Sequence, residues 1–181
     1  MIIPGIVIST ITFPGVIVHE LAHQICCRLC RIPVFEVKYF RFGNPSGYVI
    51  HEPAKSAWHS FVVSVAPFLF NTLLGILIVT PVYGFGDFSF DMSTPNGILK
   101  VLLSWISISI LMHAFPSQGD AGSLVQSVLK NKDVSIIAKV LTAPVIGLIY
   151  LGAWGSVFWL DLIYAIAVAG IGPALLIKLF F

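Results

Sequence analysis

Apolar stretches recur along the chain and are separated by short polar segments. We predict five membrane spans, each of roughly 20 residues, the length that a helix needs to cross a bilayer. They cover about residues 4–27, 56–80, 97–115, 136–159 and 162–180, and only Asp161 separates the last two. The pattern predicts an all-α polytopic membrane protein, with residues 1–181 forming a single membrane-embedded domain.

The polar segment after the first span has the pattern of strands. Residues 34–50 carry β-branched and aromatic residues on both sides of the turn-forming residues 43–47, which predicts two strands and a turn. Val34, Val37 and Tyr39 are too apolar for a free loop. We expect a small membrane-associated β-hairpin that is buried by protein, because lipid offers no hydrogen-bond partners to its backbone.

Composition supports a membrane protein and argues against other classes. The chain is 57% hydrophobic and only 10% charged, whereas soluble domains carry about 25% charged residues. The net charge is +2 without any basic block, so we expect no nucleic-acid partner. The three cysteines, Cys26, Cys27 and Cys30, are an odd set within one short stretch, which does not favour a disulfide framework.

The charges of the predicted loops alternate along the chain and predict an orientation. Positive residues occur in the first loop, in the third loop and near the C-terminus. The only charged residues of the second loop are Asp87 and Asp91. Positive loops stay in the cytoplasm. We therefore expect a multi-pass protein of the cell membrane whose N-terminus lies outside and whose C-terminus lies in the cytoplasm.

The first span contains the sequence His19-Glu20-Leu21-Ala22-His23. Histidines four apart lie on one helix face and can bind one metal ion, and ionisable residues inside a span are functional by default. Zinc accepts two imidazoles and a carboxylate and keeps a position for water. Glu20 would take the proton of that water and hand it to the leaving amine. We expect one zinc ion per chain, about 13 Å inside the cytoplasmic end of the helix.

A third protein ligand is predicted from the topology. Asp87, Asp91 and Asp161 lie on the outer side by the charge pattern, away from the metal. Asp120 follows the third span in a Pro- and Gly-rich segment, which breaks the helix at membrane depth and can return the carboxylate to the zinc. The alternative for Asp120 is an ordinary helix cap.

Two further polar residues lie within or at the end of predicted spans. Asn71, in the second span, is a candidate to bind the substrate backbone or to stabilise an oxyanion; a hydrogen bond between helices explains it equally well. His113 is a candidate to hydrogen-bond the outer side of a metal ligand, with simple packing as the alternative.

These motifs resemble the site-2 protease family of intramembrane metalloproteases over about residues 10–125. That family has HExxH in its first core span, a later aspartate in a Pro-containing segment, and a β region between them that ends in a strand like Gly47-Tyr48-Val49. The resemblance implies that Glu20 is the catalytic base and that the bond cleaved lies in or near the membrane segment of a protein substrate. His113 and Ala121 stand where the family often has Asn and Gly, which implies a distant or minimal member.

Two other classes of function are compatible with the same residues. A membrane transporter or sensor for metal ions would explain buried histidines and an aspartate, but it does not require Glu20. An inactive relative of the proteases with a regulatory role is the other alternative, because the segment around Asp120 departs from the family pattern. The sequence leaves the substrate, the regulation and the oligomeric state open.

Overall fold

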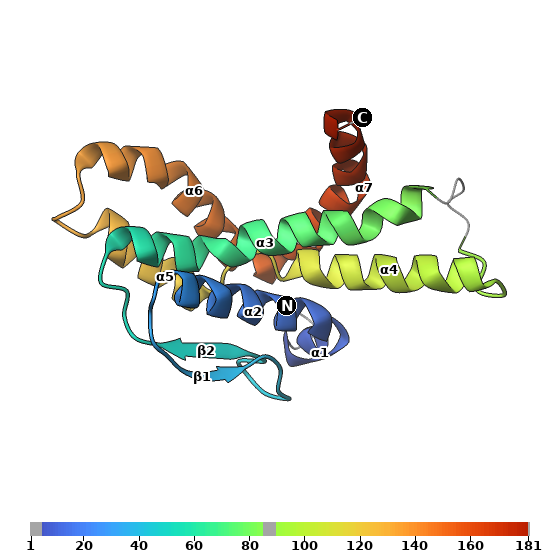
Figure 1. The fold of residues 1–181 in the computed structure, drawn as a ribbon, viewed down its shortest axis with the longest axis horizontal. Coiled ribbons are helices and arrows are strands. Elements are labelled where there is room, and N and C mark those ends of the chain that lie inside the picture. The colour runs from blue at the N-terminus through green and yellow to red at the C-terminus, as the bar shows by residue number, and fades with distance from the viewer. Residues whose placement is uncertain (1–4, 85–89, 181) are drawn as a thin grey trace.

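The computed structural model describes residues 5–84 and 90–180, and most of these residues are helical (Figure 1). The predicted start of the first span at Pro4, and Asp87 of the second loop, lie outside the described residues. The elements in chain order are α1 (Gly5–Ile11), α2 (Phe13–Leu29), β1 (Val34–Lys38), β2 (Tyr48–His51), α3 (Ala57–Gly84), α4 (Pro95–Met112), α5 (Gln118–Leu124), the π-helical turn η1 (Val125–Leu129), α6 (Ile136–Gly155), the 3₁₀ turn η2 (Ser156–Phe158) and α7 (Leu160–Phe180).

Four helices are long and apolar enough to cross a membrane: α3, α4, α6 with η2, and α7. They confirm the helices predicted at 56–80, 97–115, 136–159 and 162–180. α4 ends at Met112, three residues before the predicted end of the third span. The following Pro116 explains this early end, since the residue before a proline is pushed out of the helical conformation.

The first span, predicted over residues 4–27, is broken rather than continuous; the pair Pro14-Gly15 in the sequence predicts a kink there, and the observed break is sharper. α1 and α2 meet at an angle of 89°, and the pair forms either a broken span or a re-entrant loop. The break lies at Thr12, whose backbone is not helical, and Pro14 occupies the first turn of α2. Proline lacks the N–H that would continue the hydrogen bonding of α1, and its fixed backbone angle suits the start of a new helix.

The predicted β-hairpin is confirmed, although its connection is longer than the predicted turn. The expectation that protein buries it is wrong: its strands are half-buried or exposed, with Phe35 70% exposed, because α2 covers only part of their surface. β1 and β2 pair antiparallel, with Val37 opposite Val49, and residues 39–47 join them. This connection docks on α2: the ring of Phe40 lies 5.9 Å from that of Phe13, and the Tyr39 hydroxyl donates a hydrogen bond to the side chain of Gln24. The hairpin is thereby held beside the helix that carries the HExxH motif (Figure 1).

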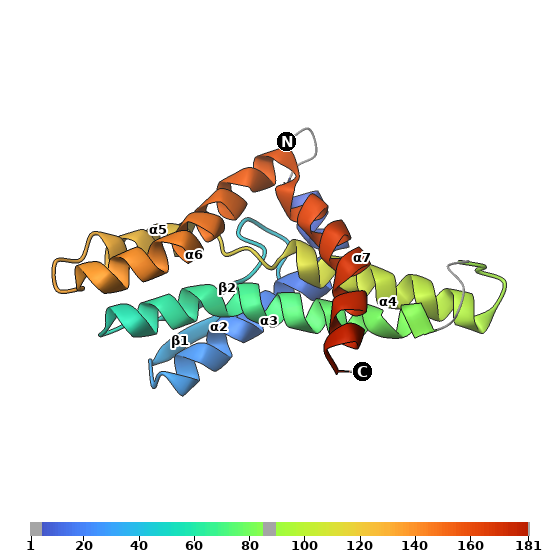
Figure 2. The same cartoon turned by 90° about the horizontal axis from the view of Figure 1, so that it is seen from above.

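The helices do not form a parallel bundle. α3 and α4 lie side by side along the longest axis, and α7 crosses this pair steeply in both views (Figures 1 and 2). α2 packs against both α3 and α4. α5 and η1 pack on the N-terminal half of α3, and α6 packs in turn on α5 and η1. Their shared core includes Val65, Leu124 and Ile149. The apolar pattern of the sequence does not predict the helical residues 118–129.

A close backbone contact fixes α2 against α4. A Cβ atom at Gly15 would lie 1.9 Å from the Ser109 carbonyl oxygen and 2.6 Å from the ring of His113. Only a residue without a side chain allows this approach. Gly15 therefore brings the HExxH turn of α2 to the C-terminal end of α4, where the chain turns toward Asp120.

The outer surface of the helices is unusually apolar. In the most apolar windows of α6 and α7 only 22% of the residues are buried, compared with 39% in α3 and α4. Large aliphatic side chains such as Leu141 and Leu151 are about 70% exposed. Water-soluble monomers rarely expose apolar patches of this extent, so the surface is compatible with a membrane protein.

Candidate metal centre

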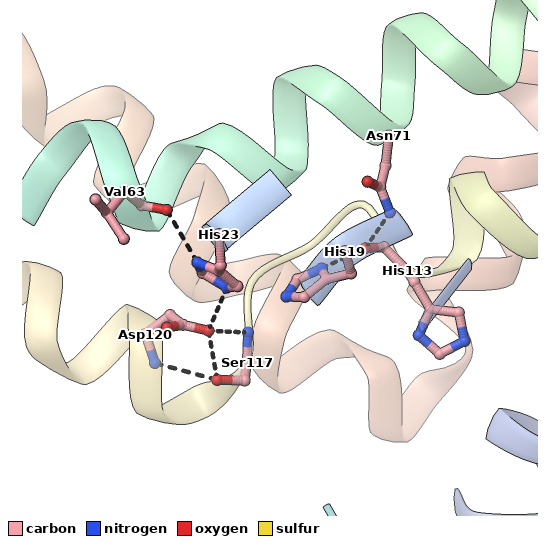
Figure 3. A network of polar contacts seen from close by, with 7 residues as sticks. All are labelled: His19, His23, Val63, Asn71, His113, Ser117 and Asp120. Carbon is pink, nitrogen blue, oxygen red and sulfur yellow. Dashed lines mark hydrogen bonds and ion pairs between the residues drawn. The ribbon is translucent and has the colours of Figure 1, made fainter. Parts of the chain in front are cut away.

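The HExxH residues lie on the buried face of α2, inside the helical assembly. His19, Glu20 and His23 are each less than 10% exposed. The two histidines are four residues apart, one turn of helix, and their rings meet edge to face with centroids 4.9 Å apart. The structure thus brings both imidazoles to one place, as predicted from their spacing (Figure 3).

Backbone carbonyls set which nitrogen of each imidazole is available. His19 Nδ1 lies 2.7 Å from the carbonyl oxygen of His113, and His23 Nδ1 lies 3.1 Å from that of Val63 on α3. A carbonyl can only accept, so each Nδ1 donates its hydrogen. We infer from this network that each Nε2 is left to bind a metal ion, the usual arrangement of metal-binding histidines.

Asp120 lies in the first turn of α5, next to His23. Its Oδ2 is 3.4 Å from His23 Nε2. The same oxygen accepts hydrogen bonds from the hydroxyl and the backbone N–H of Ser117, at 2.6 and 3.1 Å. The Asp120 N–H returns a bond to the Ser117 hydroxyl, which completes a capping box. Asp120 therefore both caps α5 and faces the histidines.

The surroundings of Asp120 favour its ionised form. Burial alone would raise the pKa of this carboxyl, but hydrogen bonding and charge interaction with His23, together with the bond from Ser117, hold the pKa below its usual range. When His23 Nε2 carries a proton, His23 and Asp120 form an ion pair. A metal ion bound between them would replace that proton. The carboxylate is ready to act as a ligand.

The three side chains fit a zinc ion. Their ligand atoms all lie within 4.8 Å of one another. Zinc bonds of 2.0–2.2 Å in a tetrahedron place ligand atoms about 3.4 Å apart, which matches the distance between His23 and Asp120. Two neutral imidazoles and one carboxylate also form a typical donor set of catalytic zinc sites. Within residues 5–84 and 90–180 no other group of three such residues meets these distances.

Glu20 lines a cavity beside the candidate ligands. The cavity has a volume of about 750 Å³, and His19 and Glu20 form part of its wall. The hairpin connection contributes residues 43–47, and the chain leading to Asp120 contributes residues 115–119. The cavity is therefore bordered by α2, by the hairpin connection and by the segment that leads to Asp120.

Asn71 and His113 lie behind His19. Asn71 is fully buried, and its Nδ2 donates hydrogen bonds to the carbonyls of Ile110 and His113, at 3.2 and 2.9 Å. The His113 carbonyl, not its ring, contacts His19; the ring nitrogen Nε2 lies 2.8 Å from the Thr12 hydroxyl. Asn71 is not among the residues that line the cavity.

Two contributors to the site were missed at the sequence level. Ser117 could have been found, because a serine three residues before an acidic residue is a capping-box pattern. Val63 could not, since it acts through its carbonyl. The cysteines at 26, 27 and 30 are free thiols, and Cys27 is buried against Ile32 and Val63.

Comparison with known proteins gives one match. No curated protein and no solved structure matches the chain. The model of the family DUF3267, described as "Putative zincin peptidase", matches residues 12–120. This match covers more than half of the chain, beginning at the break before α2 and ending at Asp120, so it includes the three candidate ligands and Glu20. The chain therefore belongs to the family DUF3267, which this description places among the zinc metallopeptidases.

Proposed function

We propose that this protein is an intramembrane zinc metallopeptidase of the site-2 protease kind, which hydrolyses a peptide bond in or near the transmembrane segment of a membrane protein. The observation that carries the proposal is the position of the metal group. His19, His23 and Asp120 converge inside an assembly whose long helices expose apolar side chains to the outside. A soluble substrate would not require such a surface around the site.

The chain's own residues account for the steps of hydrolysis. His19, His23 and Asp120 would hold the ion, and Glu20, on the wall of the same cavity, would accept a proton from water and deliver it to the leaving amine. When bound, zinc supplies a Lewis acid that polarises the scissile carbonyl and acidifies a water molecule. The substrate would have to enter the cavity in extended form, because the carbonyls of a helical peptide are occupied by hydrogen bonds.

Removal of the metal is expected to stop cleavage reversibly. The purified protein would be reconstituted in liposomes with a substrate that has a single transmembrane segment. Treatment with a zinc chelator should abolish cleavage. Addition of zinc should restore it, because the three ligands stay in place in the folded protein after the metal is removed. Calcium or magnesium serves as the control and should not restore cleavage, since these ions prefer oxygen ligands. Cleavage that persists without zinc would contradict the proposal.

Gly47 of the hairpin connection is expected to set the position of Glu20. A Cβ atom at Gly47 would lie 2.7 Å from Glu20 Cγ and 2.9 Å from Val16 Cγ1. The substitution Gly47→Ala should displace Glu20 and reduce cleavage about 10- to 100-fold, while zinc binding stays unchanged. Gly43→Ala, in the same connection, meets only ordinary contacts and is the control. Equal activity of the two variants would contradict this role of Gly47.

The predicted orientation in the membrane also becomes part of the proposal. We expect the C-terminus in the cytoplasm and the N-terminus outside, which requires α1 and α2 to act together as one broken span. Epitope tags at each terminus, tested by protease protection in sealed vesicles, measure this directly. An N-terminal tag on the cytoplasmic side would instead make α1 and α2 a re-entrant loop.

A further inference from the structure

Residues of α3 act on the carbonyls that contact both histidines. The α-helical partner of the Val63 carbonyl would be the N–H of residue 67, and Pro67 has none. This carbonyl is therefore free to accept the hydrogen from His23 Nδ1. Pro67 is itself fully buried in the interior of α3. A residue that weakens the helix thus makes a carbonyl available to a metal ligand.

Asn71, one turn after Pro67, serves the other histidine. At the end of α4 the Asn71 amide donates to the carbonyls of Ile110 and of the C-cap residue His113. The His113 carbonyl also accepts from His19 Nδ1 at 2.7 Å. A carbonyl oxygen has two lone pairs, and Asn71 and His19 occupy both (Figure 3).

The side-chain oxygen of Asn71 makes no hydrogen bond, which points to the nitrogen as the functional part of the amide. In the part of the chain that the structure describes, Asn71 Oδ1 is the one buried side-chain polar atom without a hydrogen-bond partner. An unsatisfied buried acceptor costs free energy, which an apolar side chain of similar size would avoid. The presence of an amide at this position is therefore best explained by the hydrogen bonds of its nitrogen, which hold the His113 carbonyl that contacts His19.

We propose that Pro67 and Asn71 are positioning residues, which orient His23 and His19 for metal binding through the carbonyls of Val63 and His113. In this role Asn71 acts behind the metal ligands and does not contact the substrate. The inference rests on the proposed zinc site. It assigns to residues 63–71 of α3 the orientation of two ligands on α2.

Zinc affinity and the spectrum of the cobalt-substituted protein test the role of Asn71. Loss of a group that hydrogen-bonds behind a metal ligand typically weakens metal binding about 10- to 100-fold, so Asn71→Leu should raise the Kd for zinc by that factor. The same variant should shift the visible absorption of bound Co²⁺. The control is Ser107→Ala, which removes another buried hydrogen bond between α4 and α3, from Ser107 to the Gly75 carbonyl at 2.8 Å. It should leave Kd within about threefold and the spectrum unchanged.

Pro67→Ala provides a second, independent test. Its new N–H would bond to the Val63 carbonyl along the helix axis and draw this oxygen out of line with His23 Nδ1, so we expect about tenfold weaker zinc binding without loss of thermal stability. Pro173, which is also fully buried and lies inside α7, is the matched control, and Pro173→Ala should leave zinc affinity unchanged. If Pro67 had only a structural role, its replacement would not weaken zinc binding in a protein that still folds.

Each outcome decides the inference. Wild-type affinity and spectrum in both folded variants, or equal losses in the variants and their controls, would overturn it. If Asn71→Leu does not fold, Asn71→Asp has the same shape but lacks the amide donors, and it carries the same expectation. A wild-type protein that binds no zinc would refute the proposed function itself, which is a different result from variants that bind zinc as well as the wild type.

Discussion

Replacing His23 or Asp120 by alanine is expected to release zinc from the protein. Each change leaves two of the three ligands that converge within 4.8 Å. Loss of a ligand should weaken binding by more than the 10- to 100-fold typical of losing a group that hydrogen-bonds to a ligand, so we expect the Kd for zinc to rise by more than about 100-fold. The wild-type protein, purified in detergent, should contain one zinc ion per chain, as measured by elemental analysis.

Matched variants separate ligand loss from damage to the fold. His59→Ala and Asp133→Ala make the same chemical changes at residues outside the metal group and should retain zinc. Asp120→Ala also removes the capping box with Ser117, which costs about 1 kcal/mol. Asp120→Asn keeps an acceptor for the serine but removes the charge, and it should still lose zinc. Full zinc content in either Asp120 variant would rule out this residue as a ligand.

Glu20→Gln is expected to abolish peptide cleavage while zinc stays bound. The substitution preserves the size of the side chain but removes the group that accepts a proton. General-base catalysis contributes about 10²- to 10⁴-fold to a reaction rate, so cleavage should fall by at least 100-fold. Glu20 does not belong to the ligand group, and the zinc content should therefore equal that of the wild type.

The same variant distinguishes the three classes of function. Glu36→Gln, on the exposed strand β1, is the control and should cleave like the wild type. If the protein is a transporter, the wild type and the Glu20→Gln variant should move zinc across liposome membranes equally well. If the wild type binds zinc but cleaves no substrate, that result would indicate an inactive relative of the proteases. Cleavage that survives in Glu20→Gln would exclude the assigned mechanism.

The spans and the core of the site can be predicted from the sequence because their signals are local. A long apolar helix is visible in any window of the chain, and His19 and His23 meet through the helical repeat alone. The pairing of Asp120 with these residues is not local. The order of charged loops and the Pro- and Gly-rich segment before Asp120 predict it, and the structure brings its carboxylate to His23.

Other features depend on tertiary contacts that leave little trace in the sequence. Pro14 indicates a break, but the right angle between α1 and α2 involves the packing of Gly15 on α4. Val63 and His113 orient the ligands through backbone carbonyls, which every residue has. Only the residues that make these carbonyls available, Pro67 and Asn71, carry a sequence signal.

Mapping the bond that is cut tests the central claim most directly. The purified protein would be reconstituted in liposomes with a substrate that has one transmembrane segment, beside the Glu20→Gln variant, and the products analysed by mass spectrometry. We predict a single new pair of termini within or next to the apolar segment, formed by the wild type and absent with the variant. Cleavage only in soluble parts of the substrate, or identical products from the variant, would contradict intramembrane proteolysis by this site.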